Sequence, residues 1–388
     1  MAKWFEKRLD EIAEFNPRES LKKGSIAKKI SMDKLQPFCR DVPGFELEPY
    51  SGGTKFRNGD TIMARITPCL ENGKTAKVSV LENGEVGFGS TEYIVFRAKD
   101  GCDSDFLYYL VTSSIVRGPA IKSMVGSSGR QRVQTDVLQT LMVKVPDLET
   151  QQSISGILKS LDDKIAANRK INDNLEQQAQ AIFRQELLQN GELPPNWTTG
   201  SLLDIADYLN GLAMQKFRPV DDERGLPVLK IKELRQGFCD YSSELCSPNI
   251  KPEFIVHDGD VIFSWSGSLL VDLWCGGTCG LNQHLFKVTS VKYPKWFYYT
   301  WTAHHLARFV AIAADKATTM GHIKREDLAK AEVIIPDVAS MERIGGVLQP
   351  IYDLVINQRI ENRKLSMLRD SLLPKLMSGE LDVSAIEI

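Results

Sequence analysis

The chain repeats itself at a constant offset, and this duplication constrains its fold more than any other feature. Residues 138–182 match residues 328–372 at a shift of 190, without a gap. The matched pairs include Ile154 with Ile344 and Leu158 with Leu348. A repeat of this length indicates two copies of one structural unit.

The remainder of the chain repeats more loosely, because the offset changes from one segment to the next. The looser matches are Trp4, Leu9 and Ile12 with Trp197, Leu202 and Ile205 at a shift of 193, residues 58–62 with 258–262 at 200, and residues 107–109 with 297–299 at 190. A changing offset means loops of different length within a constant frame. That combination is typical of a duplicated binding domain with two different targets.

The duplication predicts an α+β fold with two similar strand-rich domains, each followed by a long helix. The 388 residues exceed one ordinary domain. We expect a first domain over 1–147, a helix segment over 148–192, a second domain over 193–336, and a helix with a C-terminal tail over 337–388. Apolar runs bounded by Gly-rich turns predict strands at 61–66, 93–97, 261–265 and 284–288, and helices at 105–116 and 294–311.

The two long helices carry an apolar seam in steps of four and three residues, which is the heptad pattern. In both copies the middle of the seam is polar. The predicted interface consists of Ile154, Leu158, Leu161, Ile165, Asn168, Asn172 and Leu175 on the first helix, and Ile344, Leu348, Ile351, Val355, Gln358, Asn362 and Leu365 on the second.

Burying these seams against each other predicts an antiparallel coiled coil with pseudo-two-fold symmetry. Asn168 and Gln358 would then lie near the centre, where a polar layer fixes the register. In the alternative, each helix packs on its own domain and leaves the amides exposed. Pro350 interrupts the second helix early, at a position where proline can kink a helix. A helix of ~40 residues is ~60 Å long, which is long enough to act as a ruler.

Basic loops stand at equivalent positions in the two copies, although the net charge of the chain is −2. Residues 117–135 contain no acidic residue, residues 316–325 are the equivalent segment, and lysines at 22, 23, 28 and 29 form a further cluster. Such side chains reach phosphates and base edges. A solvated charged surface is the alternative. The predicted DNA-contacting residues are Lys22, Lys23, Arg117, Lys122, Ser128, Arg130, Gln131, Arg132, Lys316, Thr318, Thr319, His322, Lys324 and Arg325.

The sequence lacks the motifs expected of a methyltransferase or nuclease, so no catalytic residue is predicted. Asn16-Pro17 is followed by Arg18 rather than by a second proline, and neither a Gly-rich dinucleotide motif nor a Walker loop is present. The His304-His305 pair is expected to pack against the core. A plain coiled-coil scaffold would explain the helices but not two loop-rich domains.

The cysteines predict neither a disulfide framework nor a metal site. Seven cysteines are scattered along the chain, and the closely spaced Cys275 and Cys279 lack a second pair of ligands. The N-terminus has no apolar core of a signal peptide, and no apolar run approaches the ~20 residues that span a bilayer. We therefore expect a cytoplasmic protein with reduced cysteines, no bound metal and no membrane partner.

The order of these motifs resembles the specificity subunit of type I restriction–modification enzymes over essentially the whole chain. The resemblance is carried by the starts of the two halves, by the Gly-Asp turns at 59–60 and 259–260, and above all by two junctions. These junctions read VKVPDLETQQSISGILKSLDDKI at 143–165 and VIIPDVASMERIGGVLQPIYDLV at 333–355. The second junction departs from the first in having Met341-Glu342 where the first has two glutamines, and in having Pro350.

This resemblance implies a DNA-binding subunit without catalytic residues. Each target recognition domain would read one half of an asymmetric, bipartite sequence in double-stranded DNA. The helices would set the unread spacer and dock two methyltransferase subunits, to which two restriction subunits can add. S-adenosylmethionine and ATP would be bound by those partners and no cofactor by this chain.

Overall fold

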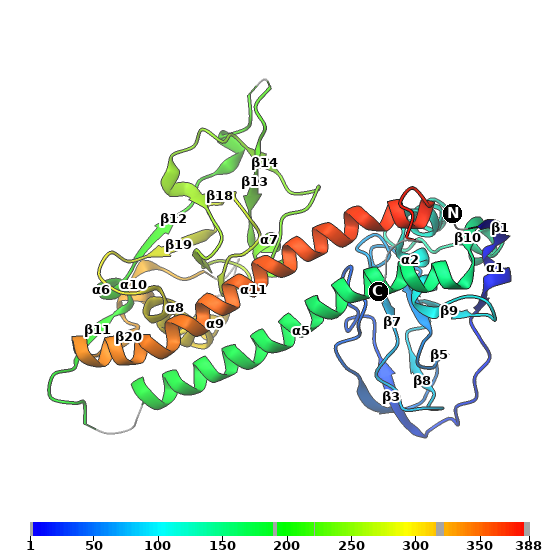
Figure 1. Cartoon of the computed structure of the whole chain (residues 1–388). Helices are drawn as coiled ribbons and strands as arrows, with labels where there is room; N and C mark the ends of the chain where they lie inside the picture. The colour runs from blue at the N-terminus through cyan, green and yellow to red at the C-terminus, as the bar shows by residue number, and fades with distance from the viewer. Residues whose placement is uncertain (1–2, 189–191, 221, 316–321, 384–388) are drawn as a thin grey trace. The chain divides into compact units, whose positions relative to one another are not determined.

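The computed structural model describes residues 3–188, 192–220, 222–315 and 322–383 and divides into two compact units (Figure 1). Unit 1 comprises residues 1–166 and 365–388, and unit 2 comprises residues 167–364. Each unit therefore contains one strand-rich region together with parts of both long helices.

In unit 1 the chain forms small sheets followed by helices. The strands are ordered β1-β10, β2-β9-β6-β7 and β4-β3-β8-β5. β3 and β8 pair in parallel, and the other strand pairs described in this unit are antiparallel. The elements are β1 (Trp4–Arg8), α1 (Leu9–Ile12), β2 (Ala13–Phe15), β3 (Ile26–Ile30), β4 (Glu46–Pro49), β5 (Thr54–Phe56), β6 (Thr61–Ala64), β7 (Thr75–Lys77), β8 (Gly87–Gly89), β9 (Tyr93–Ala98), α2 (Ser104–Thr112), α3 (Ser114–Lys122), α4 (Thr135–Gln139), β10 (Met142–Pro146) and the start of α5 (Leu148–Leu187).

Unit 2 repeats this topology strand for strand. Its strands are ordered β11-β20, β12-β19-β16-β17 and β14-β13-β18-β15, with β13 and β18 parallel. The elements are β11 (Thr198–Ser201), α6 (Leu202–Ile205), β12 (Asp207–Asn210), η1 (Met214–Lys216), β13 (Leu226–Leu229), α7 (Ile231–Gln236), β14 (Leu245–Cys246), η2 (Pro252–Phe254), β15 (Ile255–Val256), β16 (Val261–Ser264), β17 (Leu270–Leu273), β18 (Cys279–Leu281), β19 (Leu285–Thr289), α8 (Lys295–His304), α9 (Leu306–Asp315), α10 (Arg325–Ala329), β20 (Glu332–Ile335) and the start of α11 (Val338–Ser378). The duplication in the sequence is thus a duplication of the fold.

The Gly-Asp turn before β6 and β16 has the same geometry in both units. Gly59 and Gly259 have φ values of 86° and 85°, a left-handed conformation that favours glycine. The following aspartate accepts a backbone N–H from three residues earlier, at 2.7 Å for Asp60 and 2.8 Å for Asp260. These turns therefore mark equivalent points in the two units.

Two helices that the sequence predicts as continuous are broken, which corrects the expectation for 105–116 and 294–311. In unit 1 the break is at Ser113, whose backbone is extended and whose hydroxyl accepts the N–H of Ile115. In unit 2, α8 ends at His304 and α9 begins at Leu306. The apolar pattern continues across each break, because both short helices of a pair bury one face in the same core.

Each core is closed by the start of one long helix and the end of the other. In unit 1, Ile154 and Leu158 of α5 and Leu376 of α11 join the strand-rich core. In unit 2, Ile344 of α11 and Phe183 of α5 do the same. Fully burying one such side chain contributes roughly 1.5–3 kcal/mol, so both helices are firmly held at both ends.

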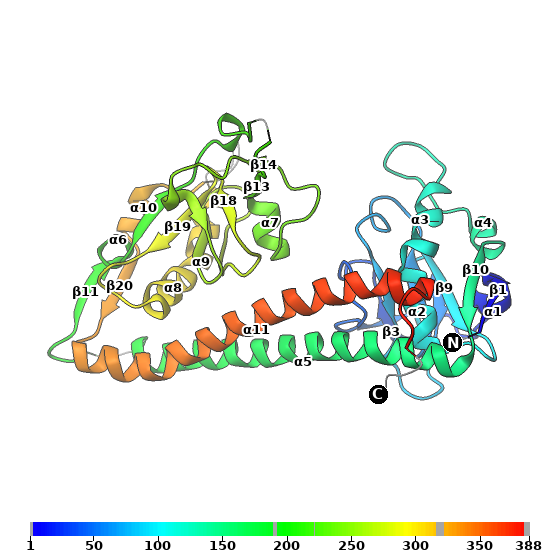
Figure 2. The same ribbon diagram turned by 45° about the horizontal axis from the view of Figure 1, so that its top comes forward.

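The helices α5 and α11 run antiparallel (Figures 1 and 2). Three ion pairs link the helices: Asp162 with Arg369, Glu176 with Arg359, and Glu186 with Arg343. The residue number in α11 falls as the residue number in α5 rises, as expected for antiparallel helices. α11 continues past Pro350 and ends at Ser378, and the next residue, Gly379, has a φ of 77°. Within the described ranges, no helix is long and apolar enough to cross a membrane.

The centre of the helix pair, which lies in unit 2, is polar and buried. Asn168 Nδ2 donates to Glu361 Oε2 at 2.7 Å and to Asn362 Oδ1 at 2.9 Å. Asn168 and Asn172 are buried, and among the described residues their Oδ1 atoms and Gln358 Oε1 have no hydrogen-bond partner. The structure therefore combines the two alternatives: the helix ends pack on the domains, while the central amides are buried rather than exposed.

The other residues of the predicted interface are buried or half-buried. Those that are buried are Ile154, Leu158, Ile165, Ile344, Leu348 and Val355, and those that are half-buried are Leu161, Leu175, Ile351 and Leu365. The apolar residues near the start of each helix contribute to the domain cores as well as to the helix pair.

Candidate nucleic-acid interface

The two basic loops occupy equivalent places in the two units. Each connects the last pair of short helices, α3 to α4 in unit 1 and α9 to α10 in unit 2. Each is also anchored to the chain just after β6 or β16. Val133 N donates to Arg65 O in unit 1, and Ile323 N donates to Trp265 O in unit 2, both at 2.9 Å.

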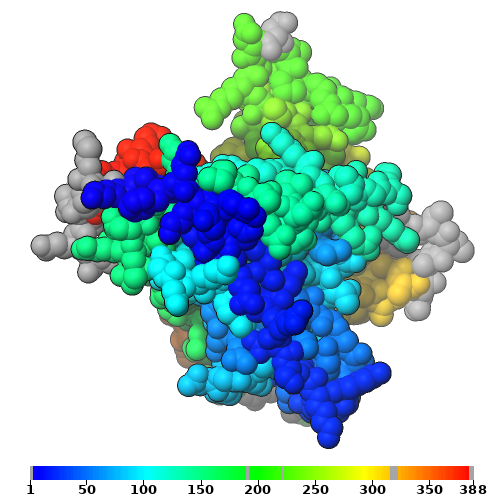
Figure 3. Space-filling model, turned by 90° about the vertical axis from the view of Figure 1, so that its right-hand side faces the viewer, coloured from blue at the N-terminus to red at the C-terminus, as the bar shows by residue number. Residues whose placement is uncertain are grey.

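In unit 1 the loop between α3 and α4 closes on itself and exposes its tip. Val125 and Arg132 form a β-bridge, and Gly126 to Arg130 are exposed, including the predicted residue Ser128. Gln131 is half-buried, and its carbonyl accepts the N–H of Thr67 at 3.0 Å. In the space-filling view of Figure 3, the segment containing α3, α4 and their loop lies within the teal part of the surface. The exposed tip leaves the side chains of Ser128 and Arg130 accessible to a ligand.

Arg132, at the base of this loop, is held by a carboxylate. Its Nε lies 3.0 Å and its Nη2 2.7 Å from Glu92 oxygens, and Arg65 Nε approaches the same carboxylate at 3.4 Å. The hydrogen bond from Arg132 lowers the pKa of Glu92, so the carboxylate is charged. Two guanidinium groups on one carboxylate leave a net positive cluster. Glu92 and Arg65 were missed by the sequence analysis, because they lie far from Arg132 in sequence.

The two predicted cations on α3 differ in their surroundings. Arg117 donates from Nη2 to Glu71 O at 2.7 Å, and its guanidinium lies 5.1 Å from the centre of the Phe38 ring. Lys122 is exposed at the end of the helix. Arg117 therefore holds a neighbouring loop in place, and its contact with DNA stays a prediction.

The lysine cluster at 22, 23, 28 and 29 separates into two kinds. Lys28 binds Glu85 and Lys29 binds Glu48, both at 2.9 Å. Glu48 lies in β4 and Glu85 lies just before β8, and both of these strands pair with β3. Lys22 and Lys23 are exposed in the turn before β3. Among the described residues, no hydrogen bond or ion pair links this turn to the loop at 123–134. Lys22 and Lys23 are therefore the members of this cluster that stay exposed.

The equivalent loop of unit 2 lies partly outside the described residues. The predictions for Lys316, Thr318 and Thr319 fall there. His322 is exposed and forms a β-bridge with Ser266, while Lys324 precedes α10 and Arg325 begins it. The described end of this loop therefore carries three exposed side chains, His322, Lys324 and Arg325.

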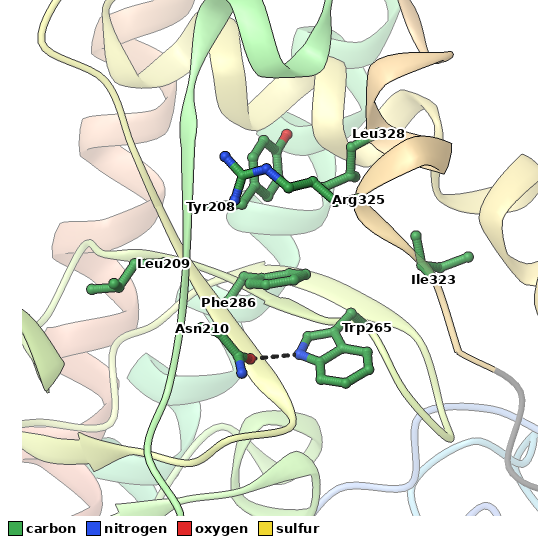
Figure 4. Close-up of a pocket in the computed structure, with 8 residues that line it drawn as sticks. All are labelled: Tyr208, Leu209, Asn210, Trp265, Phe286, Ile323, Arg325 and Leu328. Atoms are coloured by element: carbon green, nitrogen blue, oxygen red, sulfur yellow. Dashed lines mark hydrogen bonds between the residues drawn. The ribbon is translucent and has the colours of Figure 1, made fainter.

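Arg325 also lines an open, largely apolar cavity of about 430 Å³ (Figure 4). The Trp265 and Phe286 rings lie on its wall with centroids 5.6 Å apart, and Trp265 Nε1 donates to Asn210 Oδ1 at 2.9 Å. The remaining lining residues are Tyr208, Leu209, Ile323 and Leu328. Sequence reasoning missed this cavity because its aromatic residues sit in or beside separate strands, and a search for basic loops does not select them.

The described residues offer no metal site. No group of three or more His, Cys, Asp or Glu side chains gathers within the described ranges. Cys275 and Cys279 are buried free thiols, and burial raises the pKa of Cys275 to about 11. His305 stacks on Trp301 with ring centroids 6.0 Å apart and contacts Glu332 O at 2.8 Å, so it packs against the core.

Comparison with known proteins agrees with this duplicated architecture. A family model described as the type I restriction modification DNA specificity domain matches residues 1–177 and again 194–364. The MjaIX specificity subunit of Methanocaldococcus jannaschii is 26% identical over 321 residues, covering 74% of this chain and 71% of the relative. The HindI specificity subunit of Haemophilus influenzae is 21% identical over 421 residues, covering 88% and 89%. A crystal structure of the type I system S subunit from M. genitalium, 12% identical, shares the fold with a TM-score of 0.60 over 97% of this chain and 96% of that chain.

Proposed function

Since the chain belongs to the type I restriction–modification DNA specificity family, we propose that it selects an asymmetric, bipartite DNA sequence for a methyltransferase. Each strand-rich domain reads one half-site, and the helix pair sets the unread spacer. The observation that carries this proposal is the duplicated topology: one frame occurs twice, with different side chains at the same loop. The chain itself is a non-catalytic subunit, whose contribution is recognition.

The domain limits of this proposal are 1–147 and 193–336 for the target recognition domains. The segments 148–192 and 337–388 then form the spacer helices and the C-terminal tail. Two features support these limits: β10 ends at Pro146 and β20 at Ile335, and a long helix follows each within three residues. A half-site preference should therefore follow its own domain when that domain is exchanged.

We assign the exposed basic side chains to the DNA backbone. In unit 1 these are Lys22, Lys23, Lys122 and Arg130, and in unit 2 Lys324 and Arg325. Phosphate contacts give affinity that falls steeply with salt. Because the net charge is only −2, the partner subunits should supply much of the total affinity. If the isolated chain bound its site as tightly as the assembled complex at about 150 mM salt, this division would be wrong.

The partners of the proposed complex are double-stranded DNA, two methyltransferase subunits and two restriction subunits. Support for two copies comes from the duplication itself, since each unit presents the start of one long helix and the end of the other. S-adenosylmethionine and ATP would be bound by the partners. A complex that modifies the host's own DNA would act in the cytoplasm.

The test is to co-express the full chain with the methyltransferase subunit encoded nearest to it and to map modified bases across the host genome. The proposal predicts an asymmetric, two-part motif with a constant gap, and loss of that motif when this chain is omitted. Modification that is independent of this chain, or a motif without a gap, would contradict it.

A further inference from the structure

Three positions in each unit are equivalent by backbone geometry, although their side chains differ completely. Just after β6, Arg65 N donates to Glu92 O at 2.9 Å, and just after β16, Trp265 N donates to His284 O at 3.4 Å. The third position lies in the basic loop, where Arg132 bridges to Ile66 and His322 bridges to Ser266. Arg65, Glu92 and Arg132 thus correspond to Trp265, His284 and His322.

In unit 1 these positions carry an ionic cluster. Glu92 binds the Nε and Nη2 edge of Arg132 in a bidentate arrangement. The arginine side chain is still 43% exposed, against 23% for the glutamate. Nη1 has no partner among the described residues, so the terminal face of the guanidinium can bind a ligand. Glu92 orients that face, because a bidentate pair fixes the plane of the guanidinium.

In unit 2 the same positions carry an aromatic cluster. The Trp265 ring lies 6.1 Å from His284 and 6.4 Å from His322, measured between ring centroids. Ser266 Oγ holds His284 Nδ1 at 3.0 Å, and Asn210 holds the Trp265 indole N–H. Trp265 of this cluster also lines the apolar cavity shown in Figure 4. This surface can bind an apolar or flat group, and it lacks the carboxylate-held guanidinium of unit 1.

We propose that these three equivalent positions determine the base read at one equivalent place in each half-site. In unit 1, Arg132 oriented by Glu92 binds a guanine. In unit 2, the Trp265–His284–His322 cluster contacts the methyl group of a thymine. This inference rests on the proposed function, and it adds the residues that make the two half-sites different.

The chemistry of the major groove supports this assignment. Guanine presents O6 and N7 as a pair of acceptors that one guanidinium can bind together, and thymine presents its C5 methyl group for apolar contact. Lysine keeps the charge of arginine but is a point charge and cannot bind both acceptors in a fixed plane. Arg132→Lys should therefore lower the preference for guanine roughly ten- to a hundredfold.

The experiment uses the full chain with its methyltransferase subunit and maps the modified motif for each variant. Arg132→Lys and Glu92→Gln are expected to relax one base position of one half-site, and to leave the other half-site and the gap unchanged. The cluster exchange Arg65→Trp, Glu92→His and Arg132→His should convert that position from guanine to thymine. Because Glu92 is a positioning residue, Glu92→Gln should change base preference more than total modification.

Two controls separate readout from folding and from general affinity. Arg343→Lys alters another bidentate Arg–Glu pair, with Glu186 on the helices, and should leave the whole motif unchanged. Arg130→Ala removes an exposed cation of the loop tip and should weaken all sites equally. Co-purification with the methyltransferase subunit reports whether each variant folds. If the exchange in unit 1 does not fold, the reciprocal exchange Trp265→Arg, His284→Glu and His322→Arg should introduce guanine into the other half-site.

Several outcomes would overturn the inference. One is a wild-type motif without a guanine in the half-site that Arg132→Lys affects. Another is an Arg132→Lys variant that weakens every site without changing any position of the motif. A wild-type chain that directs no two-part motif at all would instead contradict the proposed function. The two failures are therefore distinguishable.

Discussion

The two units share one backbone frame, yet unit 1 places ions where unit 2 places aromatic rings. At the junction between α2 and α5 in unit 1, Tyr109 donates to Asp162, which also binds Arg369 of α11, both at 2.7 Å. The equivalent residues of unit 2, Tyr299 and Tyr352, meet as rings with centroids 5.1 Å apart. The loop clusters differ in the same way, as Glu92 with two arginines differs from Trp265 with two histidines.

The backbone frame therefore does not depend on one particular set of polar side chains. Strand order, the Gly-Asp turns and the apolar ends of the helices are common to both units. The polar and aromatic side chains that fill the same places differ between the units. A duplicated protein can therefore acquire two binding specificities without changing its fold.

The largest effect is expected at the ionic junction of unit 1. Asp162 and Arg369 have side chains that are only 5% and 12% exposed. Asp162→Asn leaves a buried guanidinium without its main counter-charge, so the free energy of unfolding should fall by about 3–5 kcal/mol. Urea unfolding of the full chain measures the loss, and hydrogen exchange should assign it to unit 1. A loss below about 1 kcal/mol would show that the pair is not structural.

An intermediate effect of opposite sign is expected at the polar centre of the helix pair. Asn168→Leu together with Asn362→Leu removes a buried amide oxygen without a partner and should stabilise the chain by about 1–2 kcal/mol. The same change removes the polar layer that fixes the register. The mapped motif should then show more than one gap length. Asn174→Leu, at an exposed position of α5, is the matched control and should change neither property.

A smaller effect is expected at the aromatic junction of unit 2. Tyr352→Phe removes only the hydroxyl that lies 3.2 Å from Thr300 Oγ1 and keeps the ring contact. The free energy of unfolding should fall by about 1 kcal/mol, measured in the same urea experiment. A loss as large as that of Asp162→Asn would contradict the prediction that the aromatic junction depends less on its polar groups than the ionic junction does.

The smallest effect concerns pH at the loop cluster of unit 1. Hydrogen bonding to Arg132 lowers the pKa of Glu92 below its ordinary value, so the pair is lost only as the pH falls through that lowered pKa. Base preference at the first half-site should therefore stay constant between pH 6 and 8. Competition binding of the complex to matched and guanine-substituted sites measures it. A change within this window would mean that Glu92 is not the orienting group.

The repeated frame can be predicted because the spacing of apolar residues is a pattern within one segment of the sequence. Contacts between segments that are distant in sequence leave no such local pattern. The repeat at an offset of 190 predicted both long helices and their central amides. In the structure the helices are antiparallel, and Asn168 bonds to Glu361 and Asn362 at their centre. The apolar periodicity did not reveal the break at Ser113, although a serine followed by a helical run is a signal for a helix start. Asn168 and Gln358 were expected near the centre of the helix pair, and each has a buried carbonyl oxygen without a partner among the described residues.

The candidate site was only partly predictable for the same reason. A search for basic loops selected Arg132 and His322, which are close in sequence to other polar residues. It missed Glu92, Trp265 and His284, because strand pairing alone brings these residues beside the loops. It also grouped Lys28 and Lys29 with free cations, although Glu85 and Glu48 from other segments neutralise them.

If the helix pair is a ruler between two independent recognition domains, a matched insertion in both helices should change the gap alone. Four residues in helical phase are added after Ala166 in α5 and after Lys364 in α11, where the two units divide. Both helices lengthen by ~6 Å, about two base pairs of DNA. We predict that the gap in the modified motif grows by about one to two base pairs while both half-sites stay the same. An unchanged gap with a functional complex, or an altered half-site, would contradict the account.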